Sequence, residues 1–230
     1  MSASTDRTWR AVLFDLDGTL ADTVQLILRC YRHTMRTHLG EELPDARWLA
    51  RLGTPLRDQL REFARDAEEA ARMLETYVTF QNGLHDEVVR AYPGAVETVQ
   101  ALGGNGTALA VVTSKHRGIA QRTVERCGLG DRFDLLVGAD DVTRGKPDPE
   151  PVLLALKRLG LSEHQGSDVL FVGDSPYDMR AGRAAGTRTA AALWGPYSRE
   201  VLEAEEPDYW LEDFSDLLRL RPGSRISGTD

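Results

Sequence analysis

Residues 11–20 read Ala-Val-Leu-Phe-Asp-Leu-Asp-Gly-Thr-Leu, and this stretch decides the fold. Its first four residues are apolar without alternation, which predicts a short strand buried on both faces, as in a parallel sheet. Two acidic residues, Asp15 and Asp17, follow at once. Because ligands of open α/β sheets bind beyond the carboxyl ends of the strands, both acids lie where a functional site is expected.

Further apolar runs of the same kind lie at residues 109–112, 135–137, 169–172 and 190–193. Segments with helical patterning separate them, such as 118–127 and 149–159. Strands that alternate with helices predict right-handed crossovers and therefore an α/β fold with a doubly wound parallel sheet.

Residues 21–90 interrupt this alternation, and we expect no strand among them. Two sets of apolar residues with helical spacing occur instead: Val24, Ile27, Leu28, Tyr31 and Met35, then Leu60, Phe63, Ala67, Leu74, Tyr77 and Val78. Pro44 and the run 53–55 break the path between them, and the turn at 92–94 leads back. We therefore predict an all-helical cap at 21–90, inserted into a core formed by 1–20 and 91–230.

Composition limits the class of protein. The chain has 230 residues, 41% of them hydrophobic, and a formal net charge of −8, which excludes general disorder and disfavours a broad nucleic-acid surface. No apolar run approaches the roughly 18 residues that span a bilayer, the first ten residues lack the apolar core of a signal peptide, and the two cysteines show no metal-site spacing. We expect a cytoplasmic monomer or weak homodimer that binds neither nucleic acid nor membrane.

The residues that follow the predicted strands favour a metal–phosphate site. Asp15, Asp17 and Asp174 would lie at neighbouring strand ends, where like charges raise one another's pKa unless a cation neutralises them. Oxygen ligands without histidine or cysteine suit Mg²⁺. Lys146 and the hydroxyls of residues 113 and 114 suit a phosphate group. The alternative is a set of solvated acids and a surface lysine, which the convergence of four segments on one edge disfavours.

Four stretches resemble the motifs of the haloacid dehalogenase superfamily, in the order found in that family: DLDGTLADT (15–23), VVTSK (111–115), GKPDPEP (145–151) and VGDSPYDM (172–179). The helical insert resembles the cap of the subfamily that contains phosphoglycolate phosphatases, pyrophosphatases and β-phosphoglucomutases. The resemblance implies a Mg²⁺-dependent phosphatase that acts on a small phosphorylated metabolite through an aspartyl-phosphate intermediate.

The resemblance also implies a role for each motif residue. Asp15 would be the nucleophile, and Asp17 would be the general acid and then the general base. Lys146 would pair with the nucleophile and the phosphate. The remaining roles are phosphate binding by Thr113, Ser114 and Lys146, metal binding by Asp15, Asp174 and the backbone carbonyl of Asp17, and support from the second shell by Asp178.

The sequence constrains the substrate less than it constrains the fold or the site residues. Asp17 argues against dehalogenation, and Thr19 favours a phosphatase over a mutase within the resemblance. Residues 51–56 resemble the substrate loop of phosphoglycolate phosphatases and pyrophosphatases, which makes Gly53 and Thr54 candidates for contacting the leaving group; the alternative is a plain helix start at Pro55. We predict phosphoglycolate phosphatase-like activity, with inorganic pyrophosphatase as the alternative and a phosphosugar mutase behind both.

Overall fold

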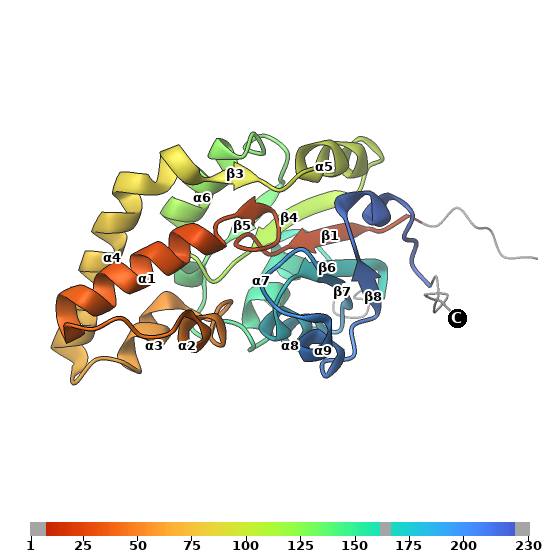
Figure 1. Cartoon of the computed structure of the whole chain (residues 1–230). Helices are drawn as coiled ribbons and strands as arrows, with labels where there is room; N and C mark the ends of the chain where they lie inside the picture. The colour runs from red at the N-terminus through yellow and green to blue at the C-terminus, as the bar shows by residue number, and fades with distance from the viewer. Residues whose placement is uncertain (1–7, 162–166, 224–230) are drawn as a thin grey trace, which may run out of the picture.

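A computed structural model describes residues 8–161 and 167–223. Its main sheet has six parallel strands in the order β5-β4-β1-β6-β7-β8. The strands are β1 (Ala11–Phe14), β4 (Ala108–Val112), β5 (Leu135–Val137), β6 (Val169–Gly173), β7 (Arg188–Ala192) and β8 (Tyr209–Leu211). Figure 1 shows the predicted α/β architecture, with helices on both faces of the sheet.

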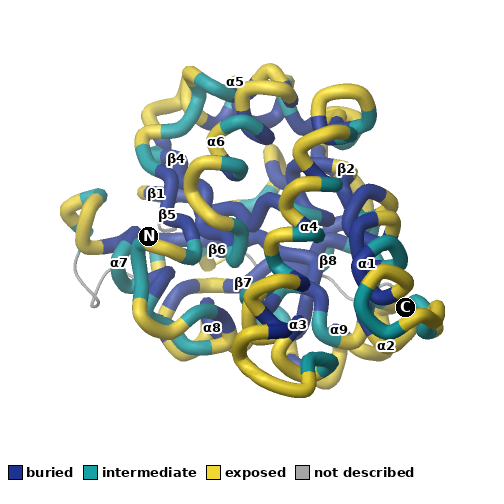
Figure 2. The backbone as a smooth tube through the Cα atoms, turned by 90° about the vertical axis from the view of Figure 1, so that its left-hand side faces the viewer, coloured by how far each residue is buried: buried dark blue, intermediate teal, exposed yellow. Residues whose placement is uncertain are grey.

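Strand β1 lies at the centre of the sheet, and burial on both faces explains its unbroken apolar run. Val12 and Phe14 face one hydrophobic cluster, covered by α5 (Ala95–Gly104), α6 (Arg117–Arg126) and η3 (Phe214–Leu218). Ala11 and Leu13 face another, covered by α7 (Glu150–Arg158) and α8 (Pro176–Ala184). The central strands are accordingly buried in Figure 2.

Three short strands were not predicted. β2 (Ala21–Asp22) and β3 (Arg90–Ala91) pair antiparallel at the two ends of the insert, so the expectation of no strand within 21–90 was wrong there. β8 is a third, and β7 begins two residues earlier than the predicted run. The two-residue strands β2 and β3 are too short to show a hydrophobic period, which is why the pattern missed them.

The insert between β2 and β3 is helical, as predicted: α1 (Val24–Leu39), α2 (Asp45–Leu49), α3 (Leu56–Arg61) and α4 (Ala67–Val88). Trp48, 1% exposed, lies at its centre, with its ring centroid 4.4 Å from Tyr31 and 6.1 Å from Tyr77. Val78 was predicted on the buried face but is 39% exposed, because it lines the cavity beside the candidate site. The division into a cap at 21–90 and a core at 1–20 and 91–230 stays a proposal.

Two short helical elements complete the described chain, η1 (Ala139–Asp141) and α9 (Arg199–Glu203). Within residues 8–161 and 167–223, no helix combines the length and apolar character needed to cross a membrane.

Candidate active site

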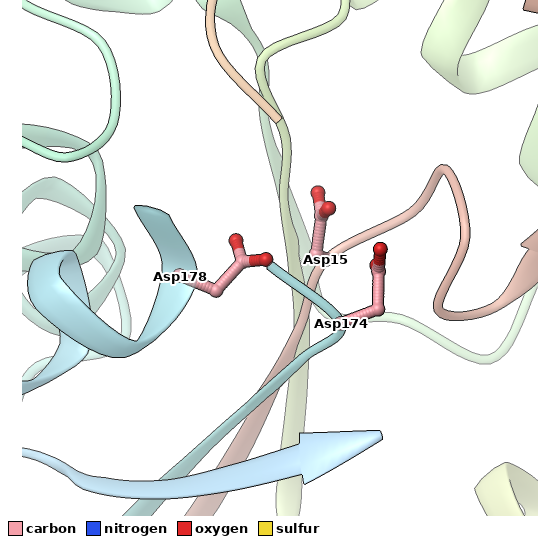
Figure 3. A group of neighbouring side chains, drawn as sticks. All are labelled: Asp15, Asp174 and Asp178. Carbon is pink, nitrogen blue, oxygen red and sulfur yellow. The ribbon is translucent and has the colours of Figure 1, made fainter. Parts of the chain in front are cut away.

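The adjacency of β1 and β6 creates the centre of the site. Their parallel register pairs Phe14 with Val172, so the next residues of both strands emerge at the same edge. Asp15 follows β1, and Asp174 follows β6. Asp178 comes from the first turn of α8, and one carboxylate oxygen from each of these three acids lies within 4.8 Å of the others (Figure 3).

These three carboxylates are 3%, 1% and 0% exposed for Asp15, Asp174 and Asp178. Burial raises the pKa of Asp15 to about 7, with Lys146 opposing that rise and Asp178 adding to it. Burial, followed by the charges of Asp178 and Asp15, raises the pKa of Asp174 well above its ordinary value. Buried acids held this close need a cation to stay ionised. An all-oxygen donor set of this kind fits a hard divalent ion such as Mg²⁺.

Lys146 supplies one positive charge to the cluster from within the fold. Its Nζ lies 2.8 Å from Asp15 Oδ1 and 2.5 Å from Asp178 Oδ1, and the residue is 2% exposed. Burial alone would lower the pKa of Lys146, but the two carboxylates outweigh it and raise that pKa above its usual value. Lys146 is therefore a permanent cation beside the predicted nucleophile.

Both carboxylate oxygens of Asp178 accept hydrogen bonds. Oδ1 pairs with Lys146, while Oδ2 accepts hydrogen bonds from the Ser175 backbone N–H at 3.1 Å and its hydroxyl at 2.5 Å. Ser175 in turn caps α8 in a capping box. These contacts suit the supporting role predicted for Asp178. The spacing Ser-x-x-Asp was a signal for the capping box that sequence reasoning did not use.

Asp174 is placed by close packing and one hydrogen bond. Thr19 Oγ1 donates to Asp174 Oδ1 at 2.5 Å. A Cβ on Gly18 would lie 2.6 Å from Asp174 Oδ2, and one on Gly195 would lie 2.3 Å from Asp174 Cβ. The sequence singled out Thr19 only as a subfamily marker. Its contact with Asp174, 155 residues away, was not foreseen.

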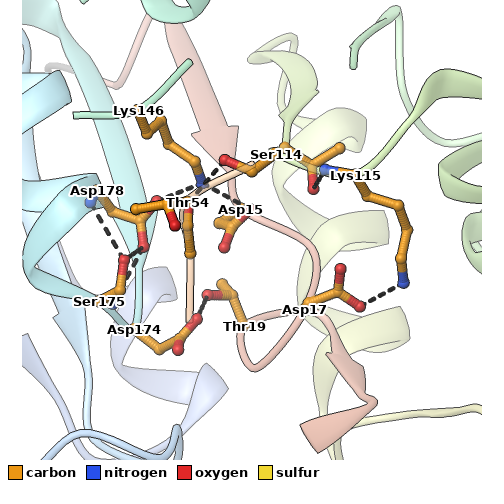
Figure 4. Close-up of polar contacts among 12 residues, drawn as sticks. Asp15, Asp17, Thr19, Thr54, Ser114, Lys115, Lys146, Asp174, Ser175 and Asp178 are labelled. Atoms are coloured by element: carbon orange, nitrogen blue, oxygen red, sulfur yellow. Dashed lines mark hydrogen bonds and ion pairs between the residues drawn. The ribbon is translucent and has the colours of Figure 1, made fainter. Parts of the chain in front are cut away.

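Asp17 lies apart from the three-carboxylate cluster, with its carboxylate directed toward Lys115 (Figure 4). Its Oδ1 accepts hydrogen bonds from Thr23 Oγ1 at 2.6 Å and from Lys115 Nζ at 2.5 Å. The Lys115 side chain is only 7% exposed. Lys115 is the last residue of the second motif, and nothing in the sequence distinguishes it from a surface lysine. Metal binding through the backbone carbonyl of Asp17 stays a prediction.

A cavity of about 880 Å³ opens between the core and the helical insert. Of the predicted site residues, it is lined by Asp15, Asp17, Gly53, Thr54, Thr113 and Ser114. Its wall also carries four lysines and arginines (Arg57, Arg61, Lys115 and Arg122), one histidine (His116) and two further aspartates (Asp58 and Asp140). The four lysines and arginines balance the four aspartates that line the cavity, so the lining carries none of the chain's net charge of −8.

The loop around Gly53 precedes a helix and also packs against the core. Pro55 does precede α3, as the alternative interpretation held. Gly53, however, has φ +101°, and a Cβ there would lie 2.7 Å from Ser175 Oγ in the core. Its carbonyl accepts a hydrogen bond from Ser114 Oγ at 2.6 Å. The loop therefore rests directly on segments that carry the site.

Comparison with known proteins agrees with this geometry. The model of the haloacid dehalogenase-like hydrolase family matches residues 12–192. The chain belongs to this family. It is 40% identical over 216 residues to the pyrophosphatase PpaX of Bacillus velezensis, covering 94% of this chain and 98% of that one.

Solved structures of haloacid dehalogenase-like hydrolases share the fold. A putative member from Bacteroides fragilis superposes with a TM-score of 0.84 at 25% identity, covering 91% of this chain and 100% of that one. A predicted phosphoglycolate phosphatase from Haemophilus somnus gives 0.83 at 24% identity, covering 92% and 97%. Identity this low supports the likeness of fold alone. The chain is thus a phosphate-ester hydrolase of this family, with an aspartate cluster that can hold a metal.

Replacing Gly18 by alanine tests how Asp174 is placed. Gly18 has φ +85°, and a Cβ there would clash with Asp174, whereas Gly40, at the end of α1, has φ +73° and a Cβ there would meet nothing within 4 Å. Both Gly→Ala variants should lose about 1–2 kcal/mol of stability in urea unfolding. Only Gly18→Ala should also raise the Mg²⁺ concentration for half-maximal activity, by about tenfold or more, because its Cβ displaces the carboxylate. Equal metal dependence of the two variants would show that this contact does not set the metal site.

Proposed function

We propose that this protein hydrolyses inorganic pyrophosphate in a Mg²⁺-dependent reaction, with Asp15 as the nucleophile. The observation that carries the proposal is a second lysine near the nucleophile, namely Lys115, which lines the cavity. Lys146 pairs with Asp15, and Lys115 lies beside Asp17, with 7% of its side chain exposed. Two ammonium groups at one site suit a substrate with a phosphate on each side of the broken bond.

The residues provide for the first chemical step as follows. An oxygen of Asp15 attacks the phosphorus, the bond between phosphorus and the bridging oxygen breaks, and that oxygen leaves with the second phosphate. Lys146 offsets negative charge on the transferred phosphoryl group. Lys115 lines the cavity and can offset the charge that develops on the leaving phosphate. The hydroxyl of Thr113 and the backbone at Ser114 are the proposed donors to the phosphoryl oxygens.

The second step returns Asp15 to its free form. Water attacks the phosphorus of the aspartyl-phosphate and gives up a proton, and the carboxylate oxygen of Asp15 is released. Asp17 is the proposed base: its Oδ1 is held by Thr23 and Lys115, and its Oδ2 makes no hydrogen bond with any described residue. Mg²⁺, held by Asp15 and Asp174, would neutralise charge on the phosphoryl oxygens.

Phosphoglycolate phosphatase activity, the leading prediction from the sequence, has less support. It rests on the loop around Gly53, which phosphoglycolate phosphatases and pyrophosphatases share, and on likeness of fold at 24% identity. The relative that is 40% identical over nearly the full chain is named a pyrophosphatase. Phosphate is a stable anion and can leave without being protonated, whereas the alkoxide of glycolate needs a proton. A lysine next to Asp17 therefore agrees better with a phosphate leaving group.

Phosphate release from pyrophosphate and from 2-phosphoglycolate, measured in parallel, tests the proposal. With Mg²⁺ present, kcat/KM for pyrophosphate should exceed that for 2-phosphoglycolate by about tenfold or more, because this ratio reports differential binding of the transition state. EDTA should abolish both activities. Asp15→Asn should abolish them too, because an amide is a poor nucleophile. A preference for 2-phosphoglycolate would contradict the substrate assignment, and turnover by Asp15→Asn would contradict the mechanism.

Lys115→Met separates the role of Lys115 from that of overall charge. Lys157→Met removes the same charge from an exposed position on α7 and is the matched control. We expect kcat/KM for pyrophosphate to fall about tenfold to a hundredfold in Lys115→Met and by less than twofold in Lys157→Met. Wild-type kinetics for Lys115→Met would remove the observation on which the choice of pyrophosphate rests.

A further inference from the structure

The loop at residues 50–54, here called the cap loop, has an unusual pattern of hydrogen bonds. Each of its five consecutive backbone carbonyls accepts a bond from a side chain. Two donors belong to the insert: Thr54 Oγ1 donates to the Arg51 carbonyl at 2.8 Å, and Gln59 Nε2 donates to the Thr54 carbonyl at 2.7 Å. Loops lack the regular backbone ladders of helices and sheets, so side-chain donors of this kind decide their conformation.

The other three donors come from the core. Tyr177 Oη donates to the Ala50 carbonyl at 2.9 Å, and Tyr197 Oη donates to the Leu52 carbonyl at 2.9 Å. Ser114 Oγ donates to the Gly53 carbonyl at 2.6 Å. Tyr177 lies on α8, one residue before Asp178, and Tyr197 lies beyond β7. Two of these donors thus come from segments that also carry predicted site residues.

Within the described chain, the backbone N–H groups of the cap loop are hydrogen-bonded at every position but one. Those of residues 50, 51, 52 and 54 donate to backbone carbonyls within the insert, at 3.0–3.2 Å. Among the described residues, the Gly53 N–H alone in this loop has no hydrogen-bond partner. Gly53 lines the cavity together with Asp15 and Thr113. An unpaired N–H at that position is available to an anionic ligand.

Tyr197 controls the orientation of this N–H group. The Gly53 N–H and the Leu52 carbonyl belong to one planar peptide unit and point in opposite directions. A hydroxyl that fixes the carbonyl therefore also fixes the N–H. Ser114 holds the next peptide plane, and Tyr177 holds the start of the loop.

We propose that Tyr177 and Tyr197 are positioning residues that clamp the cap loop so that the Gly53 N–H is held for a phosphate anion in the cavity. The assignment of pyrophosphate as that anion rests on the proposed function; the clamp itself rests on the hydrogen bonds alone. The two hydroxyls donate to loop carbonyls and not to Asp15, and neither tyrosine lines the cavity, so they act through the loop. The proposed reaction assigns the hydroxyls of Tyr177 and Tyr197 no other role.

Hydrogen–deuterium exchange of the ligand-free protein tests the clamp without any need for activity. Tyr177→Phe and Tyr197→Phe each remove one hydroxyl and keep the ring. A net hydrogen bond stabilises a folded conformation by an amount that corresponds to about fivefold in an equilibrium constant. We expect the hydrogen-bonded amides of residues 50, 51, 52 and 54 to exchange about fivefold faster in either variant, while exchange in β1 and β6 is unchanged. Tyr31→Phe is the control, because the Tyr31 hydroxyl is buried without a partner among the described residues.

Steady-state kinetics tests whether the clamp serves substrate binding. The KM for pyrophosphate should rise about fivefold in each Tyr→Phe variant with kcat within twofold of wild type, because the Gly53 N–H binds the anion equally in the ground and transition states. The same variants are also assayed with p-nitrophenyl phosphate. If the wild type does not hydrolyse pyrophosphate, the proposed function is overturned, but the KM of each variant for p-nitrophenyl phosphate still tests the clamp. Loop exchange equal to that of Tyr31→Phe, or a faster-exchanging loop with unchanged KM, would overturn the clamp.

Discussion

The attraction between Lys146 and two buried carboxylates is the interaction on which the rest of the site depends. The parallel sheet brings Asp15 and Asp174 together at its centre, and the first turn of α8 adds Asp178. Three acids at most 3% exposed cannot stay ionised together beside one ammonium group. The fold therefore holds a site that needs a further positive charge, which a divalent metal would supply.

The cap loop shows how the same core segments perform two tasks. The segment after β4 provides Thr113 to the cavity and Ser114 to the Gly53 carbonyl. The start of α8 provides Asp178 to Lys146 and Tyr177 to the Ala50 carbonyl. The proposed phosphate site and the contacts of the cap loop therefore use neighbouring residues. A change in one of these segments is expected to affect both the proposed phosphate site and the position of the cap loop.

The sequence predicted the central strands and the gathering of Asp15, Asp17 and Asp174 at neighbouring strand ends, because apolar runs followed by acids are local patterns. In the structure Asp15 and Asp174 do meet, but Asp178 rather than Asp17 completes the cluster. The family resemblance supplied the roles of these residues. Contacts between distant segments were not predictable in this way: Tyr177 meets its carbonyl across 127 residues and Tyr197 across 145. The hydrophobic periodicity of a sequence gives no information on hydrogen bonds between residues this far apart. The exposure of Val78 was missed for a related reason, since a helical face that lines a cavity has the same spacing as one that is buried.

Proton release on Mg²⁺ binding is the most direct test of the charge balance at the site. Calorimetric titration in two buffers with different ionisation enthalpies measures it. With Lys146 beside it and no metal bound, the pKa of Asp15 is raised from 3.8 to about 7, so this carboxyl keeps its proton below that value and must lose it when the metal binds. The account predicts net proton release that is larger at about pH 6 than at about pH 8 and is reduced in Asp15→Asn. Mg²⁺ binding with no proton release at either pH would contradict it.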